Sequence, residues 1–80
     1  MLSWTWTDRA QGFPRLHAQL AVQEDTALIM EYGRGMRACF APMFGFNARV
    51  MQREIAAELL RRGVQEIPNI FGPIQVTGVW

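Results

Sequence analysis

Residues 46–63 read FNARVMQREIAAELLRRG, and this stretch combines a start signal, a helical period and a stop signal. Asn47 predicts the N-cap, because its side-chain oxygen can accept a hydrogen bond from a free amide of the first turn. Gly63 predicts the end of the helix, since glycine readily adopts the left-handed conformation that is common there. We therefore expect an α-helix over residues 48–62.

At 100° per residue, this helix has an apolar stripe that we expect to face a sheet. The stripe consists of Ala48, Met51, Ile55 and Leu59. The polar side carries Glu54 and Glu58, which we expect to be solvated, and Glu58 is spaced to pair with Arg62. A second apolar patch comprises Phe46, Val50 and Ala57, with Leu60 nearby. This patch lies either under the C-terminal segment or against another chain.

The remainder of the chain consists of short apolar runs separated by glycines and prolines. Residues 2–7, LSWTWT, alternate as a half-buried strand does, and they place Trp4 and Trp6 either in the core or on an exposed aromatic pad. Residues 15–22 alternate in the same way and predict a second strand. Pro14 also allows a helix over the same residues, because proline is favoured in the first turn.

Two further runs, residues 27–32 and 36–41, flank Gly33-Arg34-Gly35 and predict a β-hairpin. In the alternative reading, Thr26 caps a short helix that ends at Gly33. Residues 67–74, IPNIFGPI, look like an irregular crossing segment, and residues 74–80, IQVTGVW, predict a closing strand. The expected fold is therefore α+β in a single domain, residues 1–80, with four or five mostly antiparallel strands and one main helix packed on one face.

The composition limits the classes of function. The net charge is +1, all eight basic residues are arginines, and half of the residues are hydrophobic, so a packed core is expected and the basic excess of a non-specific nucleic-acid binder is missing. Cys39 is the only cysteine. No apolar run reaches the length that spans a bilayer, and the first residues do not resemble a signal peptide. We expect a cytoplasmic protein that does not enter a membrane.

The sequence offers little for catalysis. Cys39 and His17 are the only candidates for a thiol–imidazole pair, and we expect them to be a core residue and a surface residue. One histidine and one cysteine do not supply a metal site, and the glycines around Arg34 do not form a phosphate-binding loop. We therefore expect no enzyme, no cofactor and no metal.

Aromatic and arginine side chains are abundant and are favoured at protein interfaces. In its size, its expected compact fold, its lack of catalytic groups and its arginine-only basic set, the chain resembles the small inhibitors of phages and mobile elements, anti-CRISPR proteins being the example. The resemblance implies a host protein or nucleoprotein complex as the partner, and steric blocking of DNA entry or of a recruitment step as the mechanism.

Several charged residues are candidates for partner binding. The acidic residues outside the helix could engage a basic DNA-binding groove: Asp8, Glu24, Asp25, Glu31 and Glu66. Arg34 and Arg37 could instead meet carboxylates, while Arg49 and Arg53 border the second apolar patch. Two alternatives are a self-associating subunit of a phage particle and a small single-stranded nucleic-acid binder that stacks bases on its tryptophans. The expected solution state is a monomer or a homodimer.

Overall fold

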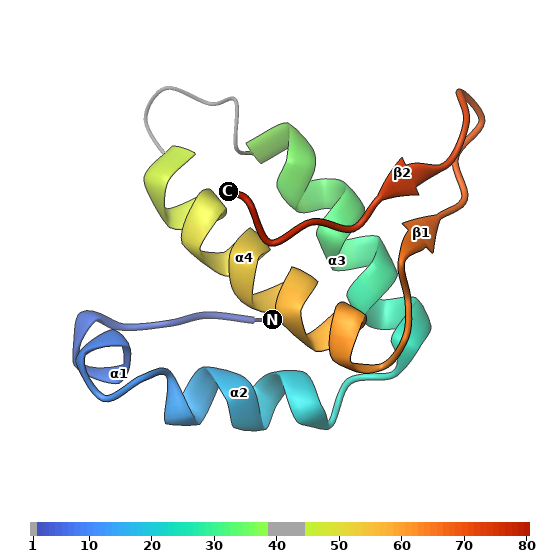
Figure 1. Ribbon diagram of the computed structural model, residues 1–80. Helices are drawn as coiled ribbons and strands as arrows, with labels where there is room; N and C mark the ends of the chain where they lie inside the picture. Colours follow the sequence, from blue (N-terminus) through green and yellow to red (C-terminus); the bar gives the residue numbers. More distant parts are fainter. Residues whose placement is uncertain (1, 39–44) are drawn as a thin grey trace.

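Four α-helices and one two-stranded hairpin make up the computed structural model, which describes residues 2–38 and 45–80 (Figure 1). The elements in chain order are α1 (Trp6–Ala10), α2 (Pro14–Ala21), α3 (Asp25–Ala38), α4 (Gly45–Arg61), β1 (Glu66–Ile67) and β2 (Ile74–Gln75). Helices α3 and α4 lie side by side, and α2 crosses below them in Figure 1. The expected α+β fold with four or five strands is therefore wrong, since the described residues form a small, mostly helical domain.

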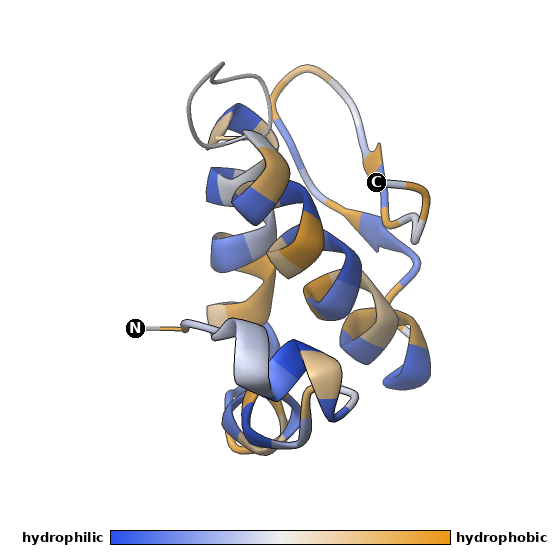
Figure 2. Cartoon of the chain, turned by 90° about the vertical axis from the view of Figure 1, so that its left-hand side faces the viewer, coloured by the Kyte–Doolittle hydropathy of each residue, from blue (hydrophilic) through white to orange (hydrophobic). Residues whose placement is uncertain are grey.

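The predicted strands fail because their apolar residues are spaced by four as well as by two. Leu16 and Leu20 are one helical turn apart on α2, and both are fully buried. Leu28 and Tyr32 repeat this spacing on α3 and are also fully buried. In Figure 2, hydrophobic and hydrophilic residues alternate along the helices, as expected for helices that bury one face.

Helix α2 begins at Pro14, as the alternative reading allowed. Helix α3 replaces the predicted hairpin: it begins at Asp25 and continues through Gly33 and Gly35, so Gly33 does not end it. Residues 39–41 of the predicted hairpin, with Cys39, lie outside the described residues. At the N-terminus, the alternating residues 2–7 form no strand, since residues 2–5 have no regular structure and α1 begins at Trp6.

The core lies between α2, α3, α4 and the C-terminal segment. Its buried hydrophobic residues are Leu16, Leu20, Leu28, Tyr32, Ile55, Ala56, Leu59, Ile67 and Val76. The Tyr32 hydroxyl accepts a hydrogen bond from the Thr77 amide at 3.2 Å, and the Tyr32 ring meets the edge of Trp80 with ring centroids 6.0 Å apart. These contacts attach the C-terminal segment to α3. The predicted closing strand is shorter than expected, because only Ile74–Gln75 pairs.

Helix α4 was predicted with the correct stop signal, Gly63, but with bounds of 48–62 in place of Gly45–Arg61. It starts at Gly45, so Asn47 lies within the helix and is not its N-cap. The stop signal matches the prediction: Gly63 has a φ of 85°, and its amide donates to the Leu60 carbonyl at 3.0 Å. The Val64 amide donates to the Leu59 carbonyl at 2.9 Å, which completes a Schellman motif.

A close contact between α3 and α4 explains one of the two glycines in α3. Gln52 of α4 is fully buried, and its Nε2 atom donates to the Tyr32 carbonyl at 2.6 Å. Its Oε1 atom has no hydrogen-bond partner among the described residues and lies against Gly35, where a Cβ would stand 2.0 Å from it. A Cβ at Gly33 would meet nothing within 4 Å. Gly35 therefore allows the two helices to approach, whereas Gly33 does not serve this contact.

The two glycines should respond in opposite ways to alanine. We expect Gly33→Ala to stabilise the fold by about 0.5–1 kcal/mol, because alanine loses less backbone entropy in a helix. We expect Gly35→Ala to destabilise it by about 1–3 kcal/mol, because the new methyl group overlaps the buried Gln52 side chain. Urea denaturation measures both changes. If both substitutions stabilise the protein, α3 and α4 do not approach this closely at Gly35.

Candidate interaction surface

The hairpin that follows α4 projects from the helical body at the upper right of Figure 1. Its strands are antiparallel, with Glu66 opposite Gln75 and Ile67 opposite Ile74. The loop between them closes with a hydrogen bond of 3.1 Å from the Gly72 amide to the Asn69 carbonyl, and Gly72 has a φ of 112°. The chain therefore reverses sharply at the tip of the hairpin.

The tip carries two large apolar side chains in solvent. Ile70 and Phe71 are adjacent in the loop, and each is 90% exposed. Single exposed apolar residues are ordinary on protein surfaces, but a pair at the end of a projecting element concentrates apolar area where another molecule can reach it. We define Ile70 and Phe71 as the hairpin tip.

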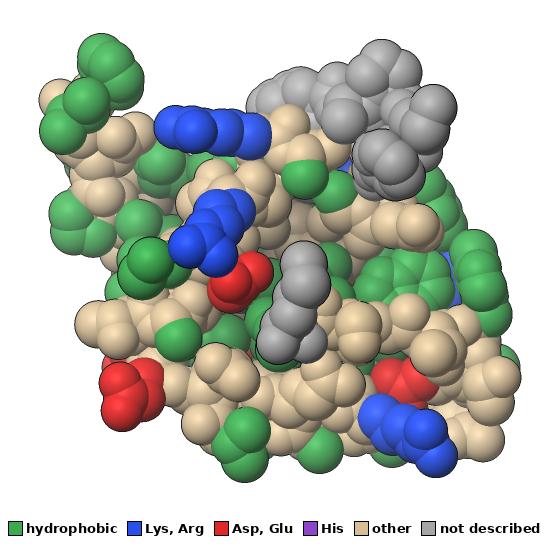
Figure 3. Space-filling model, turned by 180° about the vertical axis from the view of Figure 1, so that it is seen from behind, with side chains coloured by type: hydrophobic (Ala, Val, Ile, Leu, Met, Phe, Trp, Pro, Cys, Tyr) green, Lys and Arg blue, Asp and Glu red, His purple; other side chains and the backbone are tan. Residues whose placement is uncertain are grey.

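A groove of about 540 Å³ lies between α3 and the hairpin. Its lining residues are Ile29, Met30, Gly33, Arg34, Met36, Arg37, Ile67, Pro68, Asn69 and Ile74. Figure 3 views this side of the molecule, with hydrophobic side chains at the upper left and basic side chains next to them. Helix α3 contributes both arginines of the lining, and no lining residue is acidic. The hairpin tip and this groove together form the candidate interaction surface.

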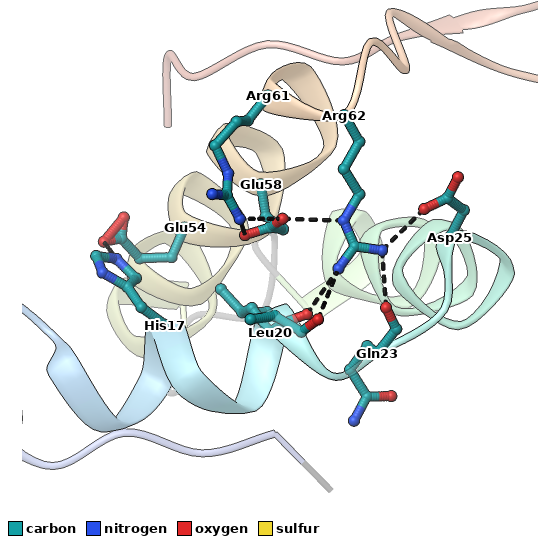
Figure 4. Close-up of polar contacts among 9 residues, drawn as sticks. His17, Leu20, Gln23, Asp25, Glu54, Glu58, Arg61 and Arg62 are labelled. Atoms are coloured by element: carbon teal, nitrogen blue, oxygen red, sulfur yellow. Dashed lines mark hydrogen bonds and ion pairs between the residues drawn. The ribbon is translucent and has the colours of Figure 1, made fainter.

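The guanidinium of Arg62 secures the point from which the hairpin leaves the helices (Figure 4). Its Nε atom donates to Glu58 Oε2 at 2.9 Å, and Nη1 donates to Asp25 Oδ1 at 2.8 Å. The same fork donates to the carbonyls of Gln23 at 2.7 Å and Leu20 at 3.0 Å. Arg62 thus joins the end of α2, the start of α3 and the end of α4, as only a planar group with several donors can.

These contacts shift the ionisation of both partners. Burial alone would raise the pKa of the Glu58 carboxyl, but hydrogen bonds from Arg61 and Arg62 outweigh burial and lower it below its ordinary value. Hydrogen bonds to Asp25 and Glu58 raise the pKa of Arg62.

The predicted pairing of Glu58 with Arg62 is confirmed. The predicted solvated face is wrong, because Glu58 is buried and Glu54 is half-buried against His17, 3.1 Å away.

Asp8, a predicted partner-binding residue, is buried and used inside the fold. Its carboxylate oxygens accept hydrogen bonds from the amides of Arg15 at 2.9 Å and Leu16 at 3.0 Å. Phe13 occupies the N-cap position of α2 in the left-handed conformation and makes no side-chain cap bond. Asp8 therefore caps α2 from α1, which satisfies amides that would otherwise lack acceptors.

The other predicted acidic residues are spread over several elements. Glu24 is exposed immediately before α3, and Asp25 is engaged by Arg62. Glu31 pairs with Arg34 at 3.2 Å on α3. Glu66 on β1 accepts a hydrogen bond from the Gln75 side chain at 2.8 Å. With Asp8 buried and Asp25 paired, the structure does not bring the five acids together as one acidic face.

Of the predicted arginines, Arg34 and Arg37 both line the groove, and they are the only pair that the structure brings to the candidate surface. Arg53 instead donates to the Trp80 carbonyl at 3.0 Å, while Arg49 is exposed on α4. The structure thus places the two predicted arginine pairs on different surfaces.

The second apolar patch of α4 is divided. Phe46 stacks on Trp6 with ring centroids 5.8 Å apart, so the N-terminal segment partly covers it. Ala57 and Leu60 are exposed at the other end of the patch, and Val50 is half-buried. The C-terminal segment reaches this helix through Trp80 and Arg53. The C-terminal segment therefore does not cover the patch as a whole, and the N-terminal segment covers part of it.

The sequence did not point to the tip residues Ile70 and Phe71. It predicts an irregular segment over residues 67–74, although Pro68, Gly72 and Pro73 surround the apolar pair with turn-forming residues. The turn-forming residues on both sides of the pair were the available signal of exposure. A tight loop lies on the surface, so its apolar side chains stay in solvent unless another element covers them.

Comparison with models of protein families, with curated proteins and with solved structures found no match for this chain. Among the described residues, no group of three or more His, Cys, Asp or Glu side chains could hold a metal ion. No helix within the same residues is long and apolar enough to cross a membrane.

The lowered pKa of Glu58 predicts a pH-dependent loss of stability. Because the folded-state pKa lies below the unfolded value, the unfolded state binds more protons, and the contribution is lost as the pH falls through the folded pKa. We expect Glu58→Gln to cost about 1–2 kcal/mol at neutral pH, from weakened charged hydrogen bonds. The difference in the free energy of unfolding between this variant and the wild type should become smaller in strong acid. Urea denaturation from neutral to strongly acidic pH measures this difference.

Glu24→Gln is the matched control, since Glu24 is exposed and lies outside the Arg62 contacts. The stability of this variant should differ little from that of the wild type at neutral pH. The free energies of unfolding of the wild type and Glu58→Gln are compared from neutral to acidic pH. If their difference stays constant, Glu58 does not contribute to stability through its charge.

Proposed function

We propose that the protein is a non-enzymatic inhibitor that binds a host protein or nucleoprotein complex and blocks one of its surfaces. This is the mode of action that the resemblance to anti-CRISPR proteins implies. The observation that carries the proposal is the hairpin tip, where Ile70 and Phe71 stand 90% exposed at the end of a projecting element.

Burial of this tip supplies the free energy for binding. Full burial of one large apolar side chain contributes about 1.5–3 kcal/mol. The loop is already held by the Asn69–Gly72 hydrogen bond and by Pro68 and Pro73, so little conformational entropy is lost when it docks. A preorganised apolar pair has the character of an interface hot spot.

The projecting hairpin and the helical body beside it suit steric blocking of a partner surface. The described residues extend 38 × 30 × 21 Å, and the hairpin projects from the helices in Figure 1. A partner that receives the tip also has the helical body placed against it. That body would cover partner surface beyond the contact itself, which is how a small protein excludes DNA or a recruited subunit.

The nucleic-acid alternative depends on the aromatic side chains near the N-terminus, which already contact one another. Trp6 is 63% exposed, but its ring stacks on Phe46 at an interplanar angle of 12°. The Arg9 guanidinium lies 5.2 Å from the Trp6 ring centroid, and Trp4 meets the same ring edge-on. A base would have to displace these neighbours before it could stack, so the arrangement favours the protein-binding proposal over this alternative.

The tip is tested by replacing Ile70 and Phe71 together with serine. Both side chains are solvent-exposed, so we expect the stability to change by less than about 0.5 kcal/mol. Affinity for the partner should fall about tenfold or more, as for loss of a hot spot. The partner is captured from lysate of the host cells, quantified by mass spectrometry and titrated against both variants. Its DNA binding is then measured with and without the wild-type protein.

Val22→Ser is the matched control, because Val22 is 79% exposed at the end of α2, away from the hairpin. It should bind like the wild type. Recovery of no stoichiometric partner, or equal binding by the tip variant, would overturn the proposal. A wild-type oligomer that the tip substitutions convert to a monomer, without a captured partner, would favour the assembly subunit instead.

A further inference from the structure

We propose that the groove between α3 and the hairpin binds an acidic amphipathic segment of the partner protein, with an apolar side chain in the groove and a carboxylate on Arg34 or Arg37. The proposal rests on the proposed function, because it names the chemistry that the same surface recognises. The groove and the hairpin tip share the hairpin, so one partner can contact both.

The floor of the groove is apolar and largely prearranged. Ile67 is buried, while Ile29, Met36 and Ile74 are half-buried and pack against the core. Met30 is exposed at the mouth of the groove. The flexible methionine side chains allow the groove to adjust to an aliphatic or aromatic anchor. The volume of about 540 Å³ lies in the range of sites that accept such groups.

The two charged residues that line the groove are both basic. Arg34 and Arg37 are one helical turn apart on α3 and are both exposed. Arg34 uses Nη1 for Glu31, so its other donors stay available for a second carboxylate. Among the described residues no carboxylate forms an ion pair with Arg37, and residues 39–44, CFAPMF, contain no acidic residue.

Charge complementarity therefore selects a partner segment with carboxylates beside an apolar anchor. Arginine binds a carboxylate through two parallel hydrogen bonds, which sets the register of the segment along α3. A nucleic-acid strand fits less well, because the groove offers two guanidiniums and no aromatic ring among its lining residues. The net charge of only +1 also favours a protein segment over a nucleic-acid strand as the ligand.

The proposal is tested with the full-length protein and a display library of short random peptides. We expect the enriched peptides to carry Asp or Glu next to Leu, Ile, Met or Phe. Their synthetic versions should bind Arg34→Glu and Arg37→Glu about tenfold or more weakly than the wild type. Met30→Ser should also weaken binding, through the apolar contact. Circular dichroism confirms that each variant is folded.

Arg49→Glu is the matched control, since Arg49 is an exposed helical arginine that does not line the groove. It should bind the enriched peptides like the wild type. The proposal is overturned if no peptide is enriched, if the enriched peptides are basic or uncharged, or if acidic peptides bind the Arg37→Glu variant as well as the wild type. Tighter binding of a single-stranded oligonucleotide than of any peptide, lost in Arg37→Glu, would also overturn it.

The captured partner separates this inference from the proposed function. If the tip variant loses the partner while Arg34→Glu and Arg37→Glu retain it, the protein-binding function stands and the acidic segment is wrong. If the tip variant also retains the partner, the protein-binding function itself fails at this surface.

Discussion

The guanidinium of Arg62 links three helices of the fold. Arg62 donates to carbonyls at the end of α2, to Asp25 at the start of α3 and to Glu58 on α4, so three helices meet at a single side chain. Carbonyls at the end of a helix lack full intrahelical bonding, and Arg62 donates to those of Leu20 and Ala21 at the end of α2 from another element. Lysine has the charge but not the planar set of donors, so it could not make these contacts together. Immediately after Arg62, Gly63 turns the chain out of α4 and toward the hairpin.

A second constraint acts between α3 and α4. The buried Gln52 side chain lies against Gly35 and donates to the Tyr32 carbonyl, while the Tyr32 hydroxyl receives the Thr77 amide of the C-terminal segment. The base of the hairpin is therefore fixed on both sides, by Arg62 at its start and by Tyr32 after β2. The helical body is held by buried contacts, whereas Ile70 and Phe71 contribute their apolar surface to none of the core. This division supports a role in binding for the hairpin.

The sequence was informative where local chemistry decided the structure. Gly63 adopts the left-handed conformation expected after the end of α4, and Glu58 forms an ion pair with Arg62 at the predicted spacing of four residues. It misled elsewhere because a separation of four residues fits both an alternating strand and a helical turn, as Leu16 with Leu20 shows. The sequence predicts Gly35 to lie in a turn, because the contact that explains this glycine is with a helix that is distant in sequence.

Of the residues that form the candidate interaction surface, only the two arginines were predicted from the sequence as partner-binding residues. Arg34 and Arg37 could be named from their position beside the glycines, but their place on a groove depends on how the hairpin returns to α3. The exposure of Ile70 and Phe71 could not be read from their hydrophobicity, because most such residues are buried. The role of the hairpin and the groove is tested most directly by amide chemical-shift changes in isotope-labelled protein when the captured partner is added. We expect the largest changes in residues 67–74 and around Arg34 and Arg37. Changes confined to α1 and α2, with residues 67–74 unaffected, would rule out this role.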